Sequence, residues 1–280
     1  MKYLKTGAEE ICFTQEDFSL EQTLQCGQCF RWRRAASGVW EGAAGGLVCR
    51  IAQEGHRFRV TGVPLPVWEE FWVPYFDLSR DYGKLKARLA AHPVLARAVE
   101  YSPGLRVLRQ PPWEALCTFI ISQNNNIPRI TGIVERLCLS FGSPIAPGWN
   151  SFPSPEQLAG LCADDLAPLR SGFRAKYILD AARKVSSGEV SLRAAALLPI
   201  EEAREELMRI SGVGQKVADC ALLYGLGRVE CCPTDVWIRR VMQQFFPQGL
   251  PEWILPEAGL AQQYLFHYAR TCPGALDRGE

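Results

Sequence analysis

The chain has 280 residues, a formal net charge of +1, 48% hydrophobic residues and 10% aromatic residues. This composition excludes a mainly disordered or fibrous protein, and the length predicts about two domains. No apolar run reaches the roughly 20 residues of a membrane span, and residues 1–12 lack the apolar stretch of a signal peptide. At face value, the near-zero net charge also argues against a nucleic-acid-binding protein.

The cysteines indicate the redox environment. There are 11 of them, an odd number scattered through the chain, which predicts free thiols in a reducing compartment. Cys26 and Cys29 have the C-x-x-C spacing of redox and zinc sites, but no strand and helix pattern surrounds them. His56, His92 and His267 lie far apart in the sequence. We therefore expect no zinc site and interpret the two cysteines as small buried residues, with a redox role as the alternative.

Residues 1–65 are rich in strand signals. Residues 47–53 and 56–60 alternate apolar and polar side chains around a turn at Glu54, which predicts a hairpin. Residues 30–33 alternate in the same way, and residues 38–40 are typical of the start of another strand. These patterns predict a small antiparallel β-rich region.

From Pro66 onward the apolar residues follow helical spacing, and no further strand is predicted. We expect helices at residues 113–122, 127–141, 153–169 (as two short helices), 174–185, 201–210, 214–226, 234–246 and 256–270. Asn126 is a good N-cap for the second of them. The predicted fold class is α+β, with an N-terminal antiparallel β-rich domain over residues 1–80 and an all-α domain over residues 81–280. A linker is expected near residues 62–80.

A turn between two predicted helices is the sharpest local signal. Gly212 and Gly214 are separated by one residue, which permits positive φ angles and close approach of the backbone. The next helix begins near Gly214, so its free N–H groups would offer a site for an anion such as a DNA phosphate. A plain tight turn between helices is the alternative.

Lys216 lies in the first turn of that next helix, where the helix dipole disfavours a cation. Desolvation and the positive helix end both favour a neutral amine, the form that acts as a nucleophile. Cys220 lies on the same helix face, and Asp235 is expected in the first turn of a later helix, capped by Thr234. A carboxylate there would stabilise positive charge that develops on a sugar. A solvated lysine and ordinary dipole complementarity are the alternatives.

Residues 207–220, followed by residues 232–236, resemble the helix-hairpin-helix and Pro-x-Asp motif of DNA glycosylases. The run from Lys216 to Cys220 most resembles the 8-oxoguanine DNA glycosylase family. Residues 27–33 are similar to the pocket strand of that family, residues 122–132 to its Asn-rich helix start, and residues 172–177 to its intercalating loop. These four motifs occur in the order of the family and together span about residues 20–270.

The resemblance implies a role for each matching residue. Lys216 would attack the sugar C1′, expel the base and form a Schiff base, and Asp235 would assist it. The backbone carbonyl of Gly27 would accept a hydrogen bond from the N7–H of the oxidised base, a donor that guanine lacks. The other implied residues are Cys220 and Phe266 on the two faces of the flipped base, Gln262 at its Watson–Crick edge, Asn124 as the plug, Arg129 and Arg174 at the orphan cytosine, Phe173 as the wedge, and Gly212 and Gly214 at a phosphate.

Taken singly, several of these residues have simpler interpretations. Asn124 belongs to a run that could be a capped turn, Arg129 and Arg174 could be solvated, and Phe173 and Phe266 could be core residues. Their order along the chain favours the functional interpretation, because an enzyme that acts on a base must take it out of the stack and fill the gap.

The resemblance therefore implies a base-excision repair enzyme that removes 8-oxoguanine opposite cytosine and then nicks the abasic strand by β-elimination. Its partner would be double-stranded DNA with oxidised guanine, with no membrane and no second subunit. No cofactor is expected, because only Cys272 follows Cys232 and four clustered cysteines are needed for an iron–sulfur cluster. A cation at the hairpin remains open. The expected location is the cytoplasm (nucleoid) in a bacterium or the nucleus in a eukaryote.

Three alternatives stay open. Another glycosylase of the superfamily would carry the iron–sulfur cysteines, or would act on alkylated bases and lack Lys216. A DNA-binding module without catalysis would use Lys216 to hold a phosphate, and a redox protein would use Cys26 and Cys29. Trp237, where the family commonly has histidine, puts a phosphate contact in doubt, and the bulky Tyr224 could narrow the pocket.

The distribution of charge changes the first impression that the net charge gave. Residues 101–136, 170–184 and 207–242 include the candidate DNA contacts and carry net charges of +2, +4 and +2. The rest of the chain therefore carries −7. A net charge of +1 is thus compatible with DNA binding that depends on salt.

Overall fold

The computed structural model of the chain describes residues 2–6 and 10–276, and these fall into two units. The first unit comprises Met1–Cys29, Ile51–Arg109 and Arg228–Glu280, and the second comprises Phe30–Arg50 and Gln110–Gly227. Each unit is therefore assembled from separate stretches of the chain. The predicted boundary between residues 80 and 81 stays a prediction, and the outer ends of the two predicted domains lie outside the described residues.

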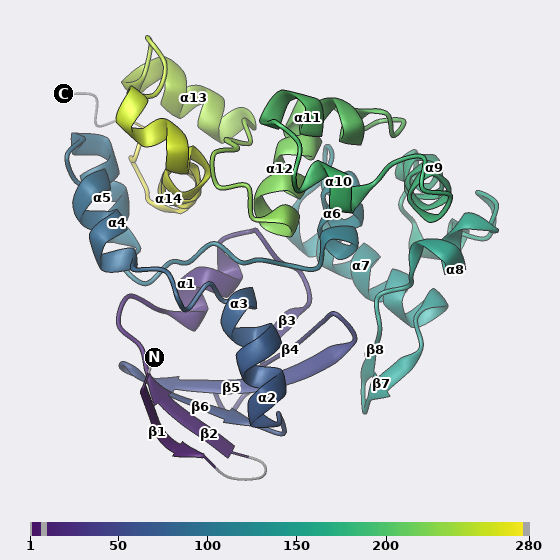
Figure 1. Cartoon of the computed structure of the whole chain (residues 1–280), viewed down its shortest axis with the longest axis horizontal. Helices are drawn as coiled ribbons and strands as arrows, with labels where there is room; N and C mark the ends of the chain where they lie inside the picture. The colour runs from purple at the N-terminus through teal and green to yellow at the C-terminus, as the bar shows by residue number, and fades with distance from the viewer. Residues whose placement is uncertain (1, 7–9, 277–280) are drawn as a thin grey trace. The chain divides into compact units, whose positions relative to one another are not determined.

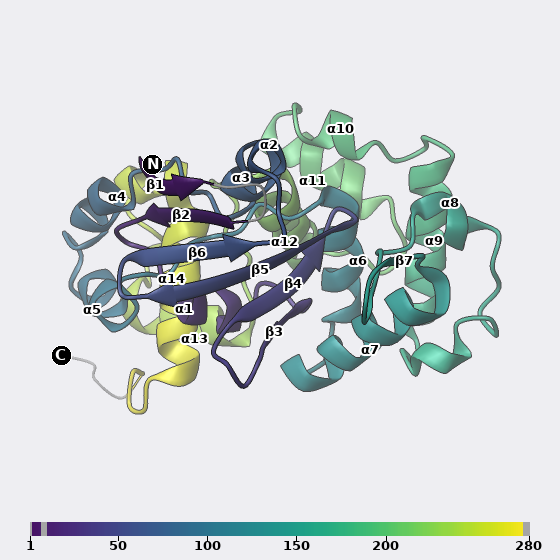
Figure 2. The same cartoon turned by 90° about the horizontal axis from the view of Figure 1, so that it is seen from below.

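The first unit combines strands and helices. Its strands lie in the order β1, β2, β6 and then residues 51–54 of β5, side by side in Figure 2. Its elements are β1 (Lys2–Thr6), β2 (Glu10–Thr14), α1 (Leu20–Gln25), β5 (Leu47–Glu54, shared with the second unit), β6 (Arg57–Thr61), α2 (Leu65–Val67), the π-helical η1 (Trp68–Trp72), α3 (Val73–Tyr75), α4 (Tyr82–Leu89), α5 (Pro93–Tyr101), α13 (Val236–Phe245), the 3₁₀ helix η3 (Glu252–Glu257) and α14 (Ala258–Thr271). The predicted hairpin of β5 and β6 is confirmed.

Alternation along β2 and β6 builds the core of the first unit. Phe13 and Phe58 are direct partners in this antiparallel pair, and their rings stack with centroids 5.0 Å apart. Trp68 packs against Phe13 at 5.2 Å and is fully buried. The stretch in which we expected a linker is therefore helical, and it packs large aromatic side chains into the core of this unit.

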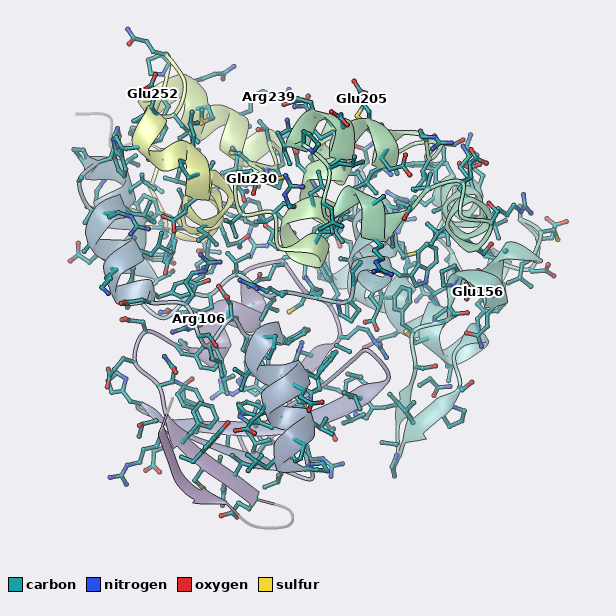
Figure 3. All side chains as sticks on the ribbon, in the orientation of Figure 1. Arg106, Glu156, Glu205, Glu230, Arg239 and Glu252 are labelled. Carbon is teal, nitrogen blue, oxygen red and sulfur yellow. The ribbon has the colours of Figure 1, made fainter. Side chains whose placement is uncertain are left out.

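Arg106 is a charged residue in the interior of the first unit (Figure 3) and is 1% exposed. Its guanidinium donates to the carbonyls of Asp77 at 2.6 Å and Asp17 at 2.9 Å, and it lies 4.3 Å from the ring centroid of Tyr82. Burial lowers the pKa of Arg106, against the opposing effect of Tyr82. Its own carbonyl accepts from Gln28 Nε2 at 2.7 Å, so this arginine supports the loop that carries Gly27.

The second unit is mainly helical. Its strands lie in the order of residues 47–50 of β5, then β4, then β3. Its elements are β3 (Trp32–Arg34), β4 (Trp40–Ala44), α6 (Pro112–Ile121), α7 (Ile127–Phe141), β7 (Pro144–Ala146), β8 (Trp149–Asn150), α8 (Pro155–Ala159), the 3₁₀ helix η2 (Ala167–Leu169), α9 (Arg174–Ser186), α10 (Leu192–Ala195), α11 (Ile200–Met208) and α12 (Gln215–Leu226). The predicted helices of this region are confirmed.

Helix α6 lies at the centre of the second unit, next to α12 (Figure 1). Every residue from Ala115 to Ile121 is buried, because this helix is apolar all round. Gly225 lets α12 approach closely, since a Cβ there would lie 3.0 Å from the Cβ of Ala115. Close packing of α6 and α12 places the start of α12, with Lys216, against the end of α6.

One expectation about secondary structure was wrong, and one helix was not predicted. We predicted no strand after Pro66, but β7 and β8 form a short antiparallel pair. These strands have three and two residues, too few for alternation to be recognised. The helix α1 interrupts the predicted β-rich region, and its N-cap Ser19 accepts from the Gln22 N–H. No helix within the described ranges is long and apolar enough to cross a membrane.

Candidate active site

The predicted hairpin joins α11 to α12 and is held in place by α9 (Figure 1). Gly212 has a φ of +77°, and Gly214 is the N-cap of α12. Asp180 on α9 accepts from the Ser211 N–H at 2.7 Å. Burial raises the pKa of Asp180, but hydrogen bonds, first that from Ser211, outweigh it and the net shift is downward. The free N–H groups at the start of α12 are thus presented by a rigid turn.

We expect Gly212→Ala to lower the free energy of unfolding by about 2 to 4 kcal/mol. Its positive φ disfavours any side chain, and a Cβ would lie 2.5 Å from the ring of Tyr177. Gly214→Ala is the matched control, because its φ is −98° and no atom lies within 4 Å of the added Cβ. That change should cost under about 1 kcal/mol. Urea denaturation measures both, and equal losses would contradict this account of the turn.

Lys216 extends from the first turn of α12 toward the end of α6. Its Nζ lies 5.4 Å from the ring centroid of Phe119 and 3.5 Å from Ser122 Oγ. The side chain is half-buried, so the amine is partly desolvated without being enclosed. Phe119 in turn stacks on Tyr224, with centroids 5.0 Å apart. The amine therefore lies over the ring of Phe119, where it can approach an electrophile.

Cys220 follows Lys216 by one helical turn and is 2% exposed. Tyr224, one turn further, is 4% exposed and stacks on Phe119, the ring over which the amine lies. The bulky ring of Tyr224 is thus packed against Phe119. Cys220 and Lys216 share one face of α12, as the sequence predicted.

The asparagine run at residues 124–126 uses its three side chains differently. Asn126 caps α7 by accepting from the Arg129 N–H at 3.0 Å, as predicted. Asn125 Nδ2 donates to the Ile121 carbonyl at 3.1 Å. Asn124 is exposed and has a φ of +46°, a left-handed conformation that a non-glycine residue adopts only where its surroundings hold it. The residue predicted as the plug is therefore an exposed asparagine in a left-handed turn.

Phe173 and Arg174 lie at the start of α9. Phe173 is 47% exposed, an unusual exposure for an aromatic side chain, and it suits the predicted wedge. Arg174 is 2% exposed, and its guanidinium donates to the carbonyls of Gln123, Asn124 and Ser171. These hydrogen bonds constrain the direction of the Arg174 guanidinium, which the resemblance places at the orphan cytosine. Arg129 is exposed and free of that constraint, with one long contact of 3.5 Å to the Arg170 carbonyl.

In the first unit, Gly27 lies in a loop that is fixed on both sides. Its φ is +86°, which favours glycine. The preceding carbonyl, that of Cys26, accepts from Gln263 Nε2 at 3.3 Å. The next residue, Gln28, is fully buried and bonds to Thr23 and Arg106 through its amide nitrogen. The carbonyl of Gly27 is therefore held in one direction before any ligand binds.

Helix α14 carries Gln262 and Phe266 one turn apart in the same unit. Gln262 is 4% exposed, and its Oε1 has no hydrogen-bond partner among the described residues. A buried orphan acceptor is costly unless a ligand satisfies it. Phe266 is half-buried, with the Arg270 guanidinium 5.2 Å from its ring centroid. The helix thus offers a polar group and an aromatic face on one side.

Asp235 is the N-cap of α13 rather than a residue of its first turn, which corrects the prediction. Its Oδ1 accepts from the N–H groups of Trp237 and Ile238, both at 2.9 Å. The predicted cap Thr234 instead donates to the Cys232 carbonyl at 3.2 Å. Aspartate and threonine are both good caps, so the sequence did not decide between them. The cap fixes the carboxylate through one oxygen.

All 11 cysteines lie in the described ranges and are free thiols. Burial raises the pKa of Cys26 to about 12 and that of Cys29 well above its ordinary value, which disfavours the thiolate that redox exchange needs. Within the part of the chain that the structure describes, no group of three or more His, Cys, Asp or Glu side chains is arranged to hold a metal ion. The thiol redox alternative therefore loses its chemical basis.

Three residues of these arrangements were not singled out from the sequence: Phe119, Ser122 and Arg270. Phe119 has no signal of its own, because it looks like any core residue of an apolar helix. Ser122 directly precedes the asparagine run, and Arg270 lies four residues after Phe266, which places it on the same helix face. The last two positions were visible in the sequence, but their contacts were not.

Two family models match most of the chain. The family model of the 8-oxoguanine DNA glycosylase N-terminal domain matches residues 10–116, and that of the HhH-GPD superfamily of base excision DNA repair proteins matches residues 117–249. A probable N-glycosylase/DNA lyase of Methanothermobacter thermautotrophicus is 32% identical over 94% of this chain and 96% of its own length.

Two solved structures are similar over nearly the whole chain. The structure of MBOgg1 in complex with a low-affinity DNA ligand has 42% identity and a TM-score of 0.90, over 96% of this chain and 99% of that one. The Clostridium acetobutylicum 8-oxoguanine glycosylase/lyase, in complex with double-stranded DNA containing cytosine opposite 8-oxoguanine, has 32% identity and a TM-score of 0.89, over 96% and 98%. The chain therefore belongs to the 8-oxoguanine DNA glycosylase family, the N-glycosylase/DNA lyases within the HhH-GPD superfamily of base excision repair enzymes.

Proposed function

We propose that this enzyme excises 8-oxoguanine opposite cytosine from double-stranded DNA and then cleaves the abasic strand, with Lys216 as the nucleophile. The observation that carries the proposal is the position of the Lys216 amine on the helix after the hairpin, above Phe119 and beside Ser122. The DNA named for the Clostridium acetobutylicum structure supports the choice of lesion and of opposite base.

The chemistry follows from an amine that attacks a sugar. Lys216 Nζ forms a bond to C1′ as the bond from C1′ to the base breaks, and the base leaves with the electron pair of that bond. Opening of the sugar ring gives an imine between Lys216 and C1′. Loss of a proton from C2′ then expels the 3′ phosphate, which nicks the strand. Asp235 assists as a carboxylate near the positive charge that develops on the sugar.

The lesion would be recognised by hydrogen-bonding groups of the protein that 8-oxoguanine pairs with and guanine leaves unpaired. The Gly27 carbonyl accepts from the N7–H that guanine lacks, and a rejected guanine would leave this carbonyl unpaired. Gln262 binds the Watson–Crick edge, and Cys220 and Phe266 contact the two faces of the base. Rigidity of the Gly27 loop makes this discrimination sharp, because the carbonyl cannot turn away from the wrong base.

The remaining site residues contact parts of the duplex other than the damaged base. Asn124 fills the position of the extruded base, and exposed Phe173 acts as the wedge beside it. Arg129 and Arg174 contact the orphan cytosine, and the guanidinium of Arg129 is already exposed. Gly212 and Gly214 allow the hairpin N–H groups to approach a phosphate. We further propose that the enzyme is a monomer that needs no cofactor, with a cation at the hairpin left open. A cytoplasmic or nuclear location stays a prediction.

Gln262→Leu should slow excision of 8-oxoguanine by about 10- to 100-fold, the worth of one to two hydrogen bonds to a base. It should not destabilise the protein, because it removes a buried acceptor that has no partner among the described residues. Single-turnover excision and thermal unfolding measure the two effects. Gln244→Leu is the control, since that amide donates to the Leu276 carbonyl on the exposed surface. A variant that loses stability but excises normally would contradict this role.

Borohydride trapping tests the proposed function. Wild-type protein is incubated with a duplex carrying 8-oxoguanine opposite cytosine, and with a matched duplex carrying guanine. A covalent protein–DNA adduct with the first duplex alone is the expected result. Protein that binds the first duplex but neither traps nor nicks it would leave only the DNA-binding module without catalysis.

A further inference from the structure

The turn that ends η2 contains an arginine with a left-handed backbone, three residues before Phe173. Arg170 has a φ of +53° and a ψ of +37°, and its N–H donates to the Ala167 carbonyl at 3.1 Å. This conformation costs free energy for a residue with a Cβ, whereas glycine adopts it without that cost. Arg170 therefore keeps a side chain at a position where the backbone alone would favour glycine.

Helix α7 contacts the peptide groups on both sides of Arg170. Arg136 donates to the Leu169 carbonyl through Nε at 3.0 Å and through Nη2 at 2.8 Å. Arg129 Nη2 lies 3.5 Å from the Arg170 carbonyl. The Leu169 side chain is fully buried, so the turn is also anchored in the core of the second unit. The surroundings thus hold the backbone of Arg170 in its left-handed conformation.

The side chain of Arg170 takes no part in this anchoring. It is exposed, and no hydrogen bond, ion pair or ring contact joins it to another residue within the described ranges. The free energy that the left-handed backbone costs is therefore not recovered by contacts of this side chain within the fold. A residue that keeps such a conformation is a candidate for function.

The charge around this turn favours an anionic ligand. Within the part of the chain that the structure describes, none of Arg129, Arg170 and Arg174 pairs with a carboxylate. Asp165, the acidic residue that is nearest along the chain, accepts from the Cys162 N–H at 2.8 Å instead. Guanidinium groups without a counter-charge attract a polyanion, and their N–H groups suit phosphate oxygens.

We infer that Arg170 binds a backbone phosphate of the undamaged strand, beside the orphan base, and that its left-handed backbone directs the side chain there. The inference rests on the proposed function, which places Arg129 and Phe173 at the orphan base, and this base belongs to the undamaged strand. A contact to phosphate adds affinity and carries no information about the base. Loss of Arg170 should therefore weaken binding by the same factor whichever base stands opposite the lesion.

The experiment measures binding to duplexes with a tetrahydrofuran abasic analogue, which β-elimination cannot cleave, opposite cytosine or adenine. Arg170→Ala should lower the affinity for both duplexes by about 3- to 10-fold at about 0.1 M salt, and reduce the slope of log affinity against log salt by about 1. Arg170→Lys should keep most of the affinity, because it keeps the charge. Arg193→Ala is the matched control, since Arg193 is an exposed arginine on α10 of the same unit, and it should bind as wild type does.

Neutral methylphosphonate linkages identify the phosphate that Arg170 contacts. They replace the phosphates of the undamaged strand one at a time, in the duplex with the abasic analogue opposite cytosine. One linkage should weaken binding of the wild type and have no effect on Arg170→Ala, because the two changes remove the same contact. Arg193→Ala should respond to every linkage as the wild type does.

Arg170→Gly separates the backbone from the side chain. It should bind as weakly as Arg170→Ala but unfold at a temperature about 1 to 3 °C higher than that variant, because glycine relieves the left-handed conformation. Thermal unfolding of the two variants measures this difference.

Four results would each overturn the inference: wild-type affinity in Arg170→Ala, a loss confined to cytosine, no linkage to which Arg170→Ala is insensitive, or equal unfolding temperatures of the glycine and alanine variants. Wild-type protein that binds the abasic analogue but leaves 8-oxoguanine in place would overturn the proposed function instead. The binding experiments do not depend on excision, so the two failures can be told apart.

Discussion

Lys216→Gln should abolish borohydride trapping and slow excision of 8-oxoguanine by about 10⁴-fold or more, as expected when a nucleophile is removed. Glutamine keeps the length and polarity of the side chain, so it can still lie over Phe119 and near Ser122. It has no amine that could form an imine with the sugar. Binding to the lesion duplex should remain within a few-fold of wild type, because one cation among many contributes modestly to affinity.

Lys84→Gln is the control for this variant, because Lys84 pairs with Asp81 on an exposed helix end far along the chain from the hairpin. It should trap and excise normally. If Lys216→Gln retained trapping at the wild-type level, another amine would have to be the nucleophile. If both binding and excision were lost, the lysine would be a phosphate contact and the DNA-binding module would become the better interpretation.

Asp235→Asn should slow excision by about 10²- to 10³-fold, the range found when a group that stabilises transition-state charge is removed. Asparagine caps helices as well as aspartate does, and its amide oxygen can accept from the N–H groups of Trp237 and Ile238. The change therefore removes a negative charge and preserves the start of α13. Single-turnover excision and thermal unfolding should show a large loss of rate at nearly unchanged stability.

Asp81→Asn is a matched control, because Asp81 is also an N-cap of the first unit and accepts from the Lys84 N–H at 2.9 Å. Both variants should have similar stability, and only Asp235→Asn should lose activity. Equal activity of the two would show that Asp235 is only a helix cap, which is the alternative that the sequence left open.

Much of the fold could be predicted because local signals and tertiary packing agree. Asn126 caps α7, the apolar residues of α7 lie on its buried face, and the turn after Glu54 joins β5 to β6. The errors came from elements that local signals cannot define. The strands β7 and β8 are too short for alternation. Asp235 and Thr234 are both good caps, so residue type alone does not decide between them.

The site could be predicted residue by residue only through the resemblance to a family. Lys216 stood out on its own, because a cation opposes the dipole at the start of a helix. The burial of Arg174 could not be predicted, since its partners, the carbonyls of Gln123 and Asn124, lie about 50 residues away in sequence. The orphan Oε1 of Gln262 is likewise a property of packing around α14 and has no counterpart in the sequence pattern.

The most direct measurement is the mass-spectrometric identification of the residue that carries the trapped DNA. Wild-type protein is reduced with borohydride on the duplex with 8-oxoguanine opposite cytosine, digested with protease and nuclease, and its peptides are sequenced. The account predicts the sugar remnant on Lys216 Nζ, the amine above Phe119. A remnant on another lysine or on the N-terminal amine, or an adduct that forms equally with undamaged guanine, would contradict it.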